Sequence, residues 1–508
     1  MNNKGVVLVV TMTFLSLLLI GGSSYLYMVT NEARQTERQV DAQKAFFLAN
    51  AGIQRGIWKI KNDNPNSETF KLKGGGSAVN YLEDKDIAMT ITPLPGNVYE
   101  IKSTSTVGNS TKTLSALIGK NQQARVFDYG YFINNWGWFY GSGITSNGDV
   151  RSNGRFDFRS NPTVEGEIYA RFEIDDGGQG ISGSGGEVDE NGDYPNQHPY
   201  SDKLDMPNLS NLSYYEDSAK TNNGTIKKGG ITLINNVFGD DAGESNGNII
   251  LIGTSTNPIE ISGTVVARGD VIIKGYVKGH GAIYAGRNIY IADDIVYKNS
   301  PSTPRPSSDD PAVVDAWVDA NKDKDLVGFA ARESVILGDY TGKTGGSWTA
   351  SSYLYSMGDE DVGQDGIPDT NDTWEDNGVF ESQYEDLDGD GVKDGNYNVT
   401  RVQTQTGITN FANCPVSVNS FDDIATNYVN YMDGIFYTNH AFAGRVGYSA
   451  SINGAIISKD EAILYRDTLT MNYDERIHSR YSTGEDVIID VPELPVDKGV
   501  TLIKWWED

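Results

Sequence analysis

The sequence predicts a mainly β protein that begins with one long α-helix and continues into a small α+β domain and a parallel β-helix (β-solenoid) with loop insertions. Three observations predict this architecture. Residues 6–30 carry no charge, an amphipathic stretch follows them without a break, and apolar residues recur at every sixth position between residues 259 and 297. At 508 residues the chain is too long for one core, so we expect several domains.

Composition narrows the fold class and the range of partners. The chain carries 57 Gly and 28 Tyr, and this abundance favours strands and tight turns over helix bundles. Its 41 basic and 69 acidic residues give a formal net charge of -28, which repels phosphates, so we expect no nucleic-acid partner. Cys414 is the only cysteine, which excludes an intrachain disulfide and a thiolate metal cluster.

The first expected element is a helix with two different halves. As a helix, residues 6–30 would span roughly 37 Å, enough to cross a membrane core of about 30 Å. From residue 31 to 61 there is no Pro, and apolar residues three and four apart mark one face of a continuing helix: Phe46, Ala49, Ile53, Ile57 and Ile60. A cleaved secretory signal is the alternative, because small residues follow residue 20, but a signal has no need of the amphipathic continuation.

Three stretches carry a resemblance to a known family. "KGVVLVVTMTFLSLLLI" places a short charged leader ending in Gly before an apolar run, and "RQVDAQKAFFLANAGIQRGIWKIK" joins aromatic and small residues to an Ala-Gly-hydrophobic step. Both resemble the N-terminal region of type IV pilins, in particular the PilX-type minor pilins and the K-type pseudopilins. "NVYEIKSTSTVGNSTKTLSALIGK" is similar to the strand pair that closes the small domain of such proteins. The resemblance covers residues 1–120.

This resemblance implies processing and assembly. A prepilin peptidase would cut between Gly5 and Val6, and the mature helix would leave the membrane to pack against other pilins or pseudopilins. Most pilins carry Glu at the fifth mature position, where this chain has Val10. K-type pseudopilins, which sit at the filament tip, lack that Glu. The resemblance therefore implies a tip or minor subunit rather than the bulk filament subunit.

The six-residue period predicts a parallel β-helix. It is carried without a break by seven apolar residues: Ile259, Val265, Val271, Val277, Ile283, Ile289 and Ile295. Such a step fits short strands separated by sharp Gly turns, which is the coil of a parallel β-helix. A weaker form appears earlier, at Ile144, Val150, Phe156 and Ile168. The coils resemble bactofilin-like and other polymer-forming β-helix modules. An antiparallel sandwich with coincidental spacing is the alternative.

An acidic stretch predicts a calcium site. "EDLDGDGVKDGN" matches the first nine positions of a calcium loop, with side-chain ligands at alternate positions, a backbone carbonyl at position seven and a carboxylate at position nine. The expected ligands of this loop are Asp386, Asp388, Asp390, Val392 and Asp394. Position twelve is Tyr397 instead of the bidentate Glu of an EF-hand, so the loop resembles a dockerin or thrombospondin type 3 repeat.

In those families a neighbouring loop completes the metal shell. "EDVGQDGIPD" offers such a neighbour, with Asp361, Asp365 and Asp369 around Gly366. A set of hard oxygen ligands suits Ca²⁺ rather than a transition metal. A solvated acidic loop without a metal is the alternative.

These signals divide the chain into consecutive segments. We expect a leader (1–5), a transmembrane segment (6–30), its amphipathic continuation (31–62), a small pilin-like β domain (63–124), a β-helix (125–299) with a long loop insertion (171–247), a Pro-rich linker and short helix (300–326), a further coil (327–357), the acidic calcium-binding insertion (358–400), and C-terminal coils with a cap (401–508). Two aromatic stretches, "FDYGYFINNWGWFY" and "LIKWWED", are expected to cover the ends of the β-helix, with sugar stacking as the alternative.

We find no set of residues that predicts catalysis, because no carboxylate pair recurs along the coils and the four histidines are scattered. The sequence therefore predicts a structural, pilin-like protein of a type IV pilus or type II secretion-like system. We expect it to be single-pass in the cytoplasmic membrane, with an extracytoplasmic β-helix displayed at a filament tip or at the cell surface. The alternatives are a surface-anchored, calcium-dependent β-helix enzyme acting on polysaccharides, and an adhesin.

Overall fold

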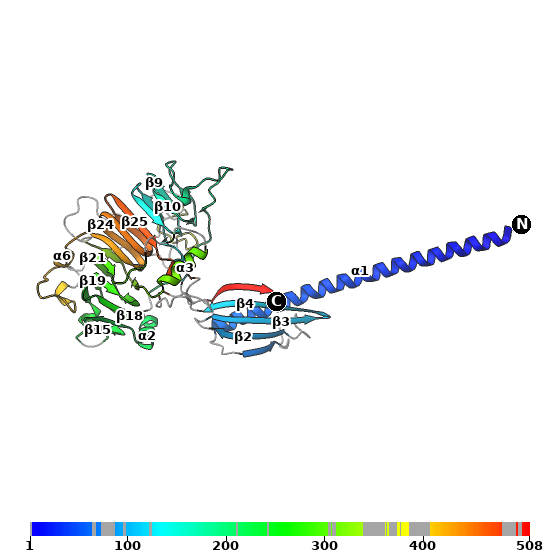
Figure 1. The fold of residues 1–508 in the computed structure, drawn as a ribbon, viewed down its shortest axis with the longest axis horizontal. Coiled ribbons are helices and arrows are strands. Elements are labelled where there is room, and N and C mark those ends of the chain that lie inside the picture. Colours follow the sequence, from blue (N-terminus) through cyan, green and yellow to red (C-terminus); the bar gives the residue numbers. More distant parts are fainter. Residues whose placement is uncertain are drawn as a thin grey trace. The chain divides into compact units, whose positions relative to one another are not determined.

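The computed structural model describes residues 3–62, 68–72, 87–94, 98–120, 124–209, 212–240, 243–302, 306, 311–338, 361, 363–364, 373–375, 377–385, 407–479, 494–495 and 500–507. The chain divides into two compact units (Figure 1). The first unit comprises residues 1–122, 483–485 and 498–508, and the second comprises residues 123–482 and 486–497.

The first unit is one long helix on a five-stranded antiparallel sheet. Its elements are α1 (Asn3–Asn62), β1 (Glu68–Leu72), β2 (Ile87–Leu94), β3 (Val98–Val107), β4 (Ser110–Lys120) and β26 (Val500–Glu507). The strand order is β1-β2-β3-β4-β26, and all four pairings are antiparallel. The N-terminal part of α1 extends beyond this sheet (Figure 1).

The pairing of the last strand differs from the expected division of the chain. "LIKWWED" was expected to cap the β-helix, but β26 pairs with β4, from Val500 opposite Lys120 to Glu507 opposite Leu114. Trp505 lies opposite Ala116 and packs edge-to-face on the Phe46 ring of α1, with a centroid distance of 6.0 Å. The second unit is therefore an insertion between two neighbouring strands of the small sheet.

The C-terminal half of α1 packs closely on this sheet. The amphipathic face predicted from the sequence is confirmed, since Ala49, Ile53 and Ile60 are fully buried against the strands. Two glycines one turn apart allow the close approach. A β-carbon at Gly52 would lie 2.1 Å from the Ser103 hydroxyl oxygen of β3, and one at Gly56 would lie 2.8 Å from Ile101. The small residues of the Ala-Gly-hydrophobic step thus set the distance between helix and sheet.

The second unit consists mainly of short parallel strands. Its strands are β5 (Tyr131–Ile133), β6 (Gly137–Tyr140), β7 (Ile144–Asn147), β8 (Val150–Ser152), β9 (Phe156–Arg159), β10 (Thr163–Glu165), β11 (Ile168–Ala170), β12 (Ile174–Asp175), β13 (Gln197–His198), β14 (Thr225–Lys228), β15 (Ile231–Asn235), β16 (Val237–Phe238), β17 (Ile249–Gly253), β18 (Ile259–Ala267), β19 (Val271–Lys278), β20 (His280–Ala285), β21 (Ile289–Tyr297), β22 (Leu326–Ala331), β23 (Val335–Leu337), β24 (Val429–Leu464) and β25 (Thr468–Tyr473). The helices are α2 (Ser213–Asn222), α3 (Pro311–Asn321), α6 (Phe421–Ile424) and the short 3-10 turns η1 (Arg125–Asp128), η2 (Ser184–Gly186), η3 (Ser245–Gly247), η4 (Ile408–Asn410) and η5 (Glu475–Ile477).

Parallel pairing explains the six-residue period. The seven periodic positions from Ile259 to Ile295 are all fully buried in one hydrophobic cluster. Val265 pairs in parallel with Ile283. The partners lie three six-residue steps apart along the chain, so each turn of the chain contributes three inward positions. This pairing excludes the antiparallel sandwich that the spacing had left open.

The expected β-helix is borne out only in part. β18 turns a corner without interruption, because its residue Ile259 pairs with Val277 of β19, whereas its residue Gly263 pairs with Gly281 of β20. Strands that continue through corners in this way join neighbouring faces. The parallel strands therefore close into a barrel of seven strands rather than a clear solenoid with separate faces.

The chain enters this array of parallel strands in its middle. β5 pairs in parallel with Ile456–Ser458 of β24 on one side and with β8 on the other. The first aromatic stretch, which contains β5, therefore does not cover an end of the array, and that prediction is wrong. The two ends of the unit also meet, because the Tyr473 hydroxyl donates to the Phe127 carbonyl at 2.7 Å and the Ser479 N–H donates to Asp128 Oδ1 at 2.7 Å.

The insertion expected at residues 171–247 contains regular structure that its polar composition did not predict. It holds α2 and several short strands, and the Tyr215 ring of α2 stacks on Tyr284 of β20 with a centroid distance of 4.0 Å. Outside this segment, α3 (Pro311–Asn321) lies within residues 300–326, where the sequence predicted a short helix.

The close approach at Gly52 yields a test. Gly52→Val is expected to lower the stability of the first unit by about 1–3 kcal/mol, because the larger side chain would overlap Ser103 and Ile87 of the sheet. Hydrogen exchange of the β2 and β3 amides measures this loss. Gly22→Val is the matched control, since no atom lies within 4 Å of a β-carbon at Gly22. Equal protection of the amides in both variants would contradict the close packing.

Candidate functional site

The N-terminal half of α1 presents an uncovered apolar surface. The large apolar side chains between Val7 and Met28 are 57–71% exposed. This helix is long and apolar enough to cross a membrane. No other described helix meets that criterion. One helix thus has a docked half and a half whose surface suits lipid or other helices.

Several hydroxyl groups of this half bond to the backbone of their own helix. The hydroxyl groups of Thr11, Ser16 and Ser23 donate to the carbonyl groups four residues earlier, at 2.7, 2.8 and 2.6 Å. A hydroxyl that bonds to its own helix leaves no unsatisfied donor in lipid. These residues are therefore compatible with burial in a bilayer or a helical bundle.

The expected processing site lies in the first turns of α1. Gly5 and Val6 belong to the helical backbone, and their side-chain surroundings lie outside the described residues. Val10, at the position where most pilins carry Glu, is 62% exposed and belongs to the same apolar surface. The exposed half of α1 therefore presents no carboxylate at this depth.

Most of the expected calcium ligands fall outside the described part of the chain. These are Asp386, Asp388, Asp390, Val392, Asp394, Asp365 and Asp369. Asp361 is described and buried, and its two carboxylate oxygens accept the N–H groups of Asn377 and Gly378 at 3.2 and 2.8 Å. Glu385 is fully buried and accepts the N–H groups of Gly363 and Glu381 at 3.1 and 2.7 Å. Among the described residues, no three metal-ligating side chains come together.

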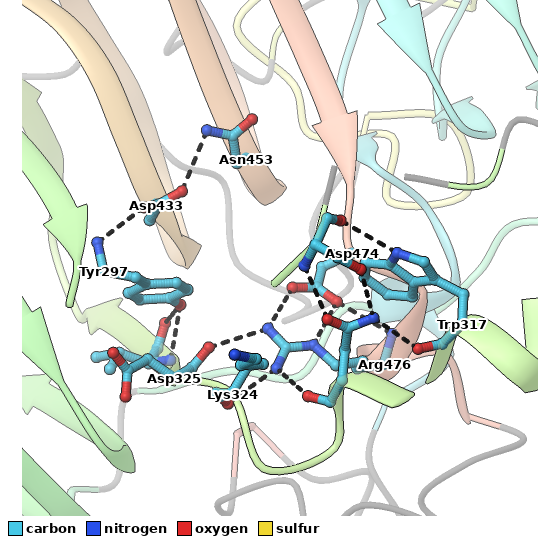
Figure 2. A network of polar contacts seen from close by, with 11 residues as sticks. Tyr297, Trp317, Lys324, Asp325, Asp433, Asn453, Asp474 and Arg476 are labelled. Carbon is cyan, nitrogen blue, oxygen red and sulfur yellow. Dashed lines mark hydrogen bonds and ion pairs between the residues drawn. The ribbon is translucent and has the colours of Figure 1, made fainter. Parts of the chain in front are cut away.

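A fully buried arginine holds the C-terminal end of the second unit (Figure 2). Arg476 lies in η5, and its guanidinium forms two bonds with the Asp474 carboxylate, at 2.8 and 2.7 Å. Its other donors bind the carbonyl groups of Asn321, Lys324 and Asp325 at 2.9–3.1 Å. All five donors of the guanidinium are thus used, and three of them bind the end of α3 and the loop that follows it.

The same polar network links successive strands. The Asp433 carboxylate of β24 accepts the Tyr297 N–H at 2.8 Å and the Asn453 amide at 3.1 Å (Figure 2). Tyr297 in turn accepts the Val327 N–H on its hydroxyl at 2.8 Å. Because each of these groups is buried and paired, the network fixes the register of the strands rather than forming a reactive centre.

Glu461 is a buried acid whose pKa is strongly raised. Its carboxylate accepts the Tyr131 hydroxyl at 3.0 Å and the Ile463 N–H. Burial raises the pKa of Glu461 to about 8, and the neighbouring Asp460 charge adds to the shift. The side chain is therefore protonated at neutral pH and lies against the cavity between Trp138 and Tyr465.

Sequence reasoning did not single out Arg476, Asp474 or Glu461. A lone Arg or Glu carries no sequence signal of burial, because the partners that enclose it, such as Asn321 for Arg476 and Tyr131 for Glu461, lie more than a hundred residues away along the chain. Gly52 and Gly56 did carry a signal, since they stand four residues apart in the amphipathic half of the first helix.

Comparison with known proteins gives little beyond this geometry. No protein-family model and no curated protein matches the chain. Among solved structures, the competence-associated pilin ComZ from Thermus thermophilus is similar, with 9% identity over 92% of this chain and 98% of that chain, at a TM-score of 0.30. Because this TM-score is low, the functional argument rests on the geometry of α1 and its sheet.

The pKa of Glu461 predicts a pH dependence of stability. The folded state holds the proton up to about pH 8, whereas the unfolded side chain releases it near pH 4.5. The stabilising contribution of the protonated form is therefore complete below pH 4.5 and is lost, by roughly 1.4 kcal/mol per pH unit, as the pH rises to 8. Glu461→Gln should remove this loss and raise the melting temperature at pH 8 relative to the unaltered chain.

Thermal unfolding at pH 5, 6.5 and 8 measures the effect. The difference in melting temperature between Glu461→Gln and the unaltered chain is expected to grow steadily with pH. Glu187→Gln, a change on the exposed surface, should leave the pH profile unaltered. A constant difference across the three pH values would show that the substitution acts through packing alone.

Proposed function

We propose that this chain is a pilin-like structural subunit of a type IV pilus or type II secretion-like filament that displays its inserted β domain at the filament tip or the cell surface. The observation that carries the proposal is the division of α1 into two halves. One half is docked on an antiparallel sheet, and the other presents a continuous, exposed apolar surface. A helix that served only as a soluble domain core would be covered along its whole length.

The mechanism follows from the two environments that suit the exposed half. In the bilayer its apolar side chains face lipid, and in a filament the same side chains would face the equivalent helices of other pilins. Because Val10 brings no carboxylate into that helix bundle, the subunit is suited to a tip or minor position. The second unit has no described group arranged for catalysis, and we propose a structural rather than an enzymatic role for it.

Removal of the leader tests the proposal. A prepilin peptidase is expected to cut between Gly5 and Val6, so that the mature chain begins at Val6. Gly5→Leu should abolish cleavage, because a bulky side chain would stand at the cut. Intact-mass spectrometry of the chain expressed together with its own prepilin peptidase measures the outcome.

Gly21→Leu is the control for this experiment, since it changes a glycine of the same helix away from the proposed cut and should leave cleavage intact. Co-purification of the processed chain with other pilins tests the second half of the mechanism. A chain that keeps Met1 in the presence of the peptidase would mean a plain membrane anchor. A chain that begins after residue 22 or 24 would mean a discarded signal.

We also propose that the acidic stretch binds Ca²⁺. The donor set is chemically suitable, because Asp386, Asp388, Asp390 and Asp394 supply hard oxygens and Val392 supplies a carbonyl, with Asp365 and Asp369 as a second source. Nearby, the buried carboxylates of Asp361 and Glu385 are each fixed by two backbone N–H groups. A bound cation would offset the repulsion of so many acidic side chains.

The calcium proposal predicts a metal-dependent stability. Addition of millimolar Ca²⁺ to the EGTA-treated chain should raise the melting temperature, because a ligand that binds only the folded state stabilises it by mass action. Asp388→Ala with Asp390→Ala should abolish this rise. Asp189→Ala with Asp193→Ala, a matched pair in another acidic loop, should preserve it. No rise in the unaltered chain, or the same rise in both pairs of variants, would overturn the proposal.

A further inference from the structure

An aromatic row lies on the outer side of a small parallel sheet in the second unit. The sheet consists of β6, β9 and β12, paired in parallel. Trp136, Trp138 and Tyr140 occupy alternate positions along and just before β6, so they share one side of the strand, while Phe139 between them is buried in the core. The ring centroids are 6.2 Å apart for the two tryptophans, 5.2 Å for Trp138 and Tyr140 and 6.2 Å for Trp136 and Tyr140, so the rings form a compact group in which Tyr140 is edge-on to both tryptophans.

These rings are accessible although they are large and apolar. Tyr140 is 39% exposed, and Trp136 and Trp138 are half-buried. The strand just before the row, β5, is paired on both sides, so the row does not cover an unpaired strand. Trp138 is oriented by a hydrogen bond from its indole N–H to the Glu461 carbonyl at 3.2 Å. The row is thus a fixed surface rather than a cap over exposed strand ends.

The next two strands place charged groups beside the rings, and both arginines among them are paired with carboxylates. Arg155 binds Asp157 at 2.7 Å and Glu173 at 2.9 Å, and Arg159 binds Asp175 at 2.8 Å. The Arg159 guanidinium also lies 5.8 Å from the centre of the Tyr140 ring. Because both guanidinium groups already bind carboxylates, the surface offers hydrogen-bond donors and acceptors without a free positive charge.

A hollow continues the aromatic row toward the interior. Trp138 and Tyr140 line this cavity together with Tyr465, Glu461 and Tyr131, and the Tyr131 hydroxyl donates to the Glu461 carboxyl group at 3.0 Å. The Tyr465 hydroxyl donates to the Tyr140 carbonyl at 3.1 Å, which places its ring at the edge of the row. The indole N–H of Trp136 is buried and has no hydrogen-bond partner among the described residues.

We infer that this surface, defined by Trp136, Trp138, Tyr140 and Tyr465, binds a neutral polysaccharide. The C–H faces of sugar rings pack on aromatic rings, and sugar hydroxyl groups pair with carboxylates and guanidinium groups that are held in place. A compact group of rings beside paired charges suits the apolar face of one sugar unit within a neutral glycan. An anionic polymer is disfavoured, because the local cations are paired and the whole chain carries a net charge of -28.

The test uses the full-length chain in lipid nanodiscs and isothermal titration calorimetry. The probes are cellohexaose and chitohexaose, with hexagalacturonate as the anionic comparison. At least one neutral hexasaccharide should bind saturably with a dissociation constant of about 1 mM or lower. Trp138→Ala and Tyr140→Ala should each weaken that binding at least about tenfold, which corresponds to roughly 1.4 kcal/mol.

Three controls separate stacking from loss of structure. Trp374→Ala removes another partly exposed tryptophan and should leave binding unchanged. Tyr140→Phe keeps the ring and should retain most of the affinity. Circular dichroism of each variant should match that of the unaltered chain.

The inference is overturned by three outcomes: no saturable binding of either neutral hexasaccharide up to about 10 mM, unchanged affinity in both alanine variants, or tighter binding of hexagalacturonate. None of them bears on the filament proposal, which depends on α1 alone.

Discussion

The pairing of β4 with β26 is the constraint on which the architecture depends. These strands are neighbours in one sheet, yet about 380 residues separate them along the chain. A domain can occupy that interval only if its first and last residues lie close together, because the two strands are hydrogen-bonded to each other. The hydrogen bonds from Tyr473 to Phe127 and from Ser479 to Asp128 satisfy this requirement inside the inserted unit itself.

The inserted unit satisfies the constraint through the order of its strands. The first strand of the unit, β5, lies between β8 and β24 in the parallel array. The chain therefore adds strands on the β8 side first, continues on the other side and returns at β24, beside β5. Arg476 then binds the end of α3 and the loop that follows it with three hydrogen bonds, and two more bonds pair it with Asp474. Because breaking such a network would leave a buried charge unpaired, the junction is held far more firmly than surface ion pairs would hold it.

The features that depend on local sequence patterns were predicted, and those that depend on long-range contacts mostly were not. The two halves of α1 and the buried six-residue period could be predicted from the sequence, because each depends on residues a few positions apart. The return of β26 to the small sheet was not, since its alternating residues suit any strand and its partner β4 is remote. For the same reason the corner-turning strands of the barrel escaped prediction. Of the candidate site, the apolar helix surface was predicted, whereas Glu461 and the cavity beside it were not, because only the fold brings Tyr131 and Trp138 to that carboxyl group.

The pairing of β26 with β4 also makes the small sheet a check on the folding of the inserted unit. Until that unit has brought its ends together, the β4 edge on which β26 pairs stays open. An unpaired edge strand invites aggregation and proteolysis. A chain whose inserted unit fails to fold would therefore expose this edge to aggregation and proteolysis, although β4 itself lies outside that unit.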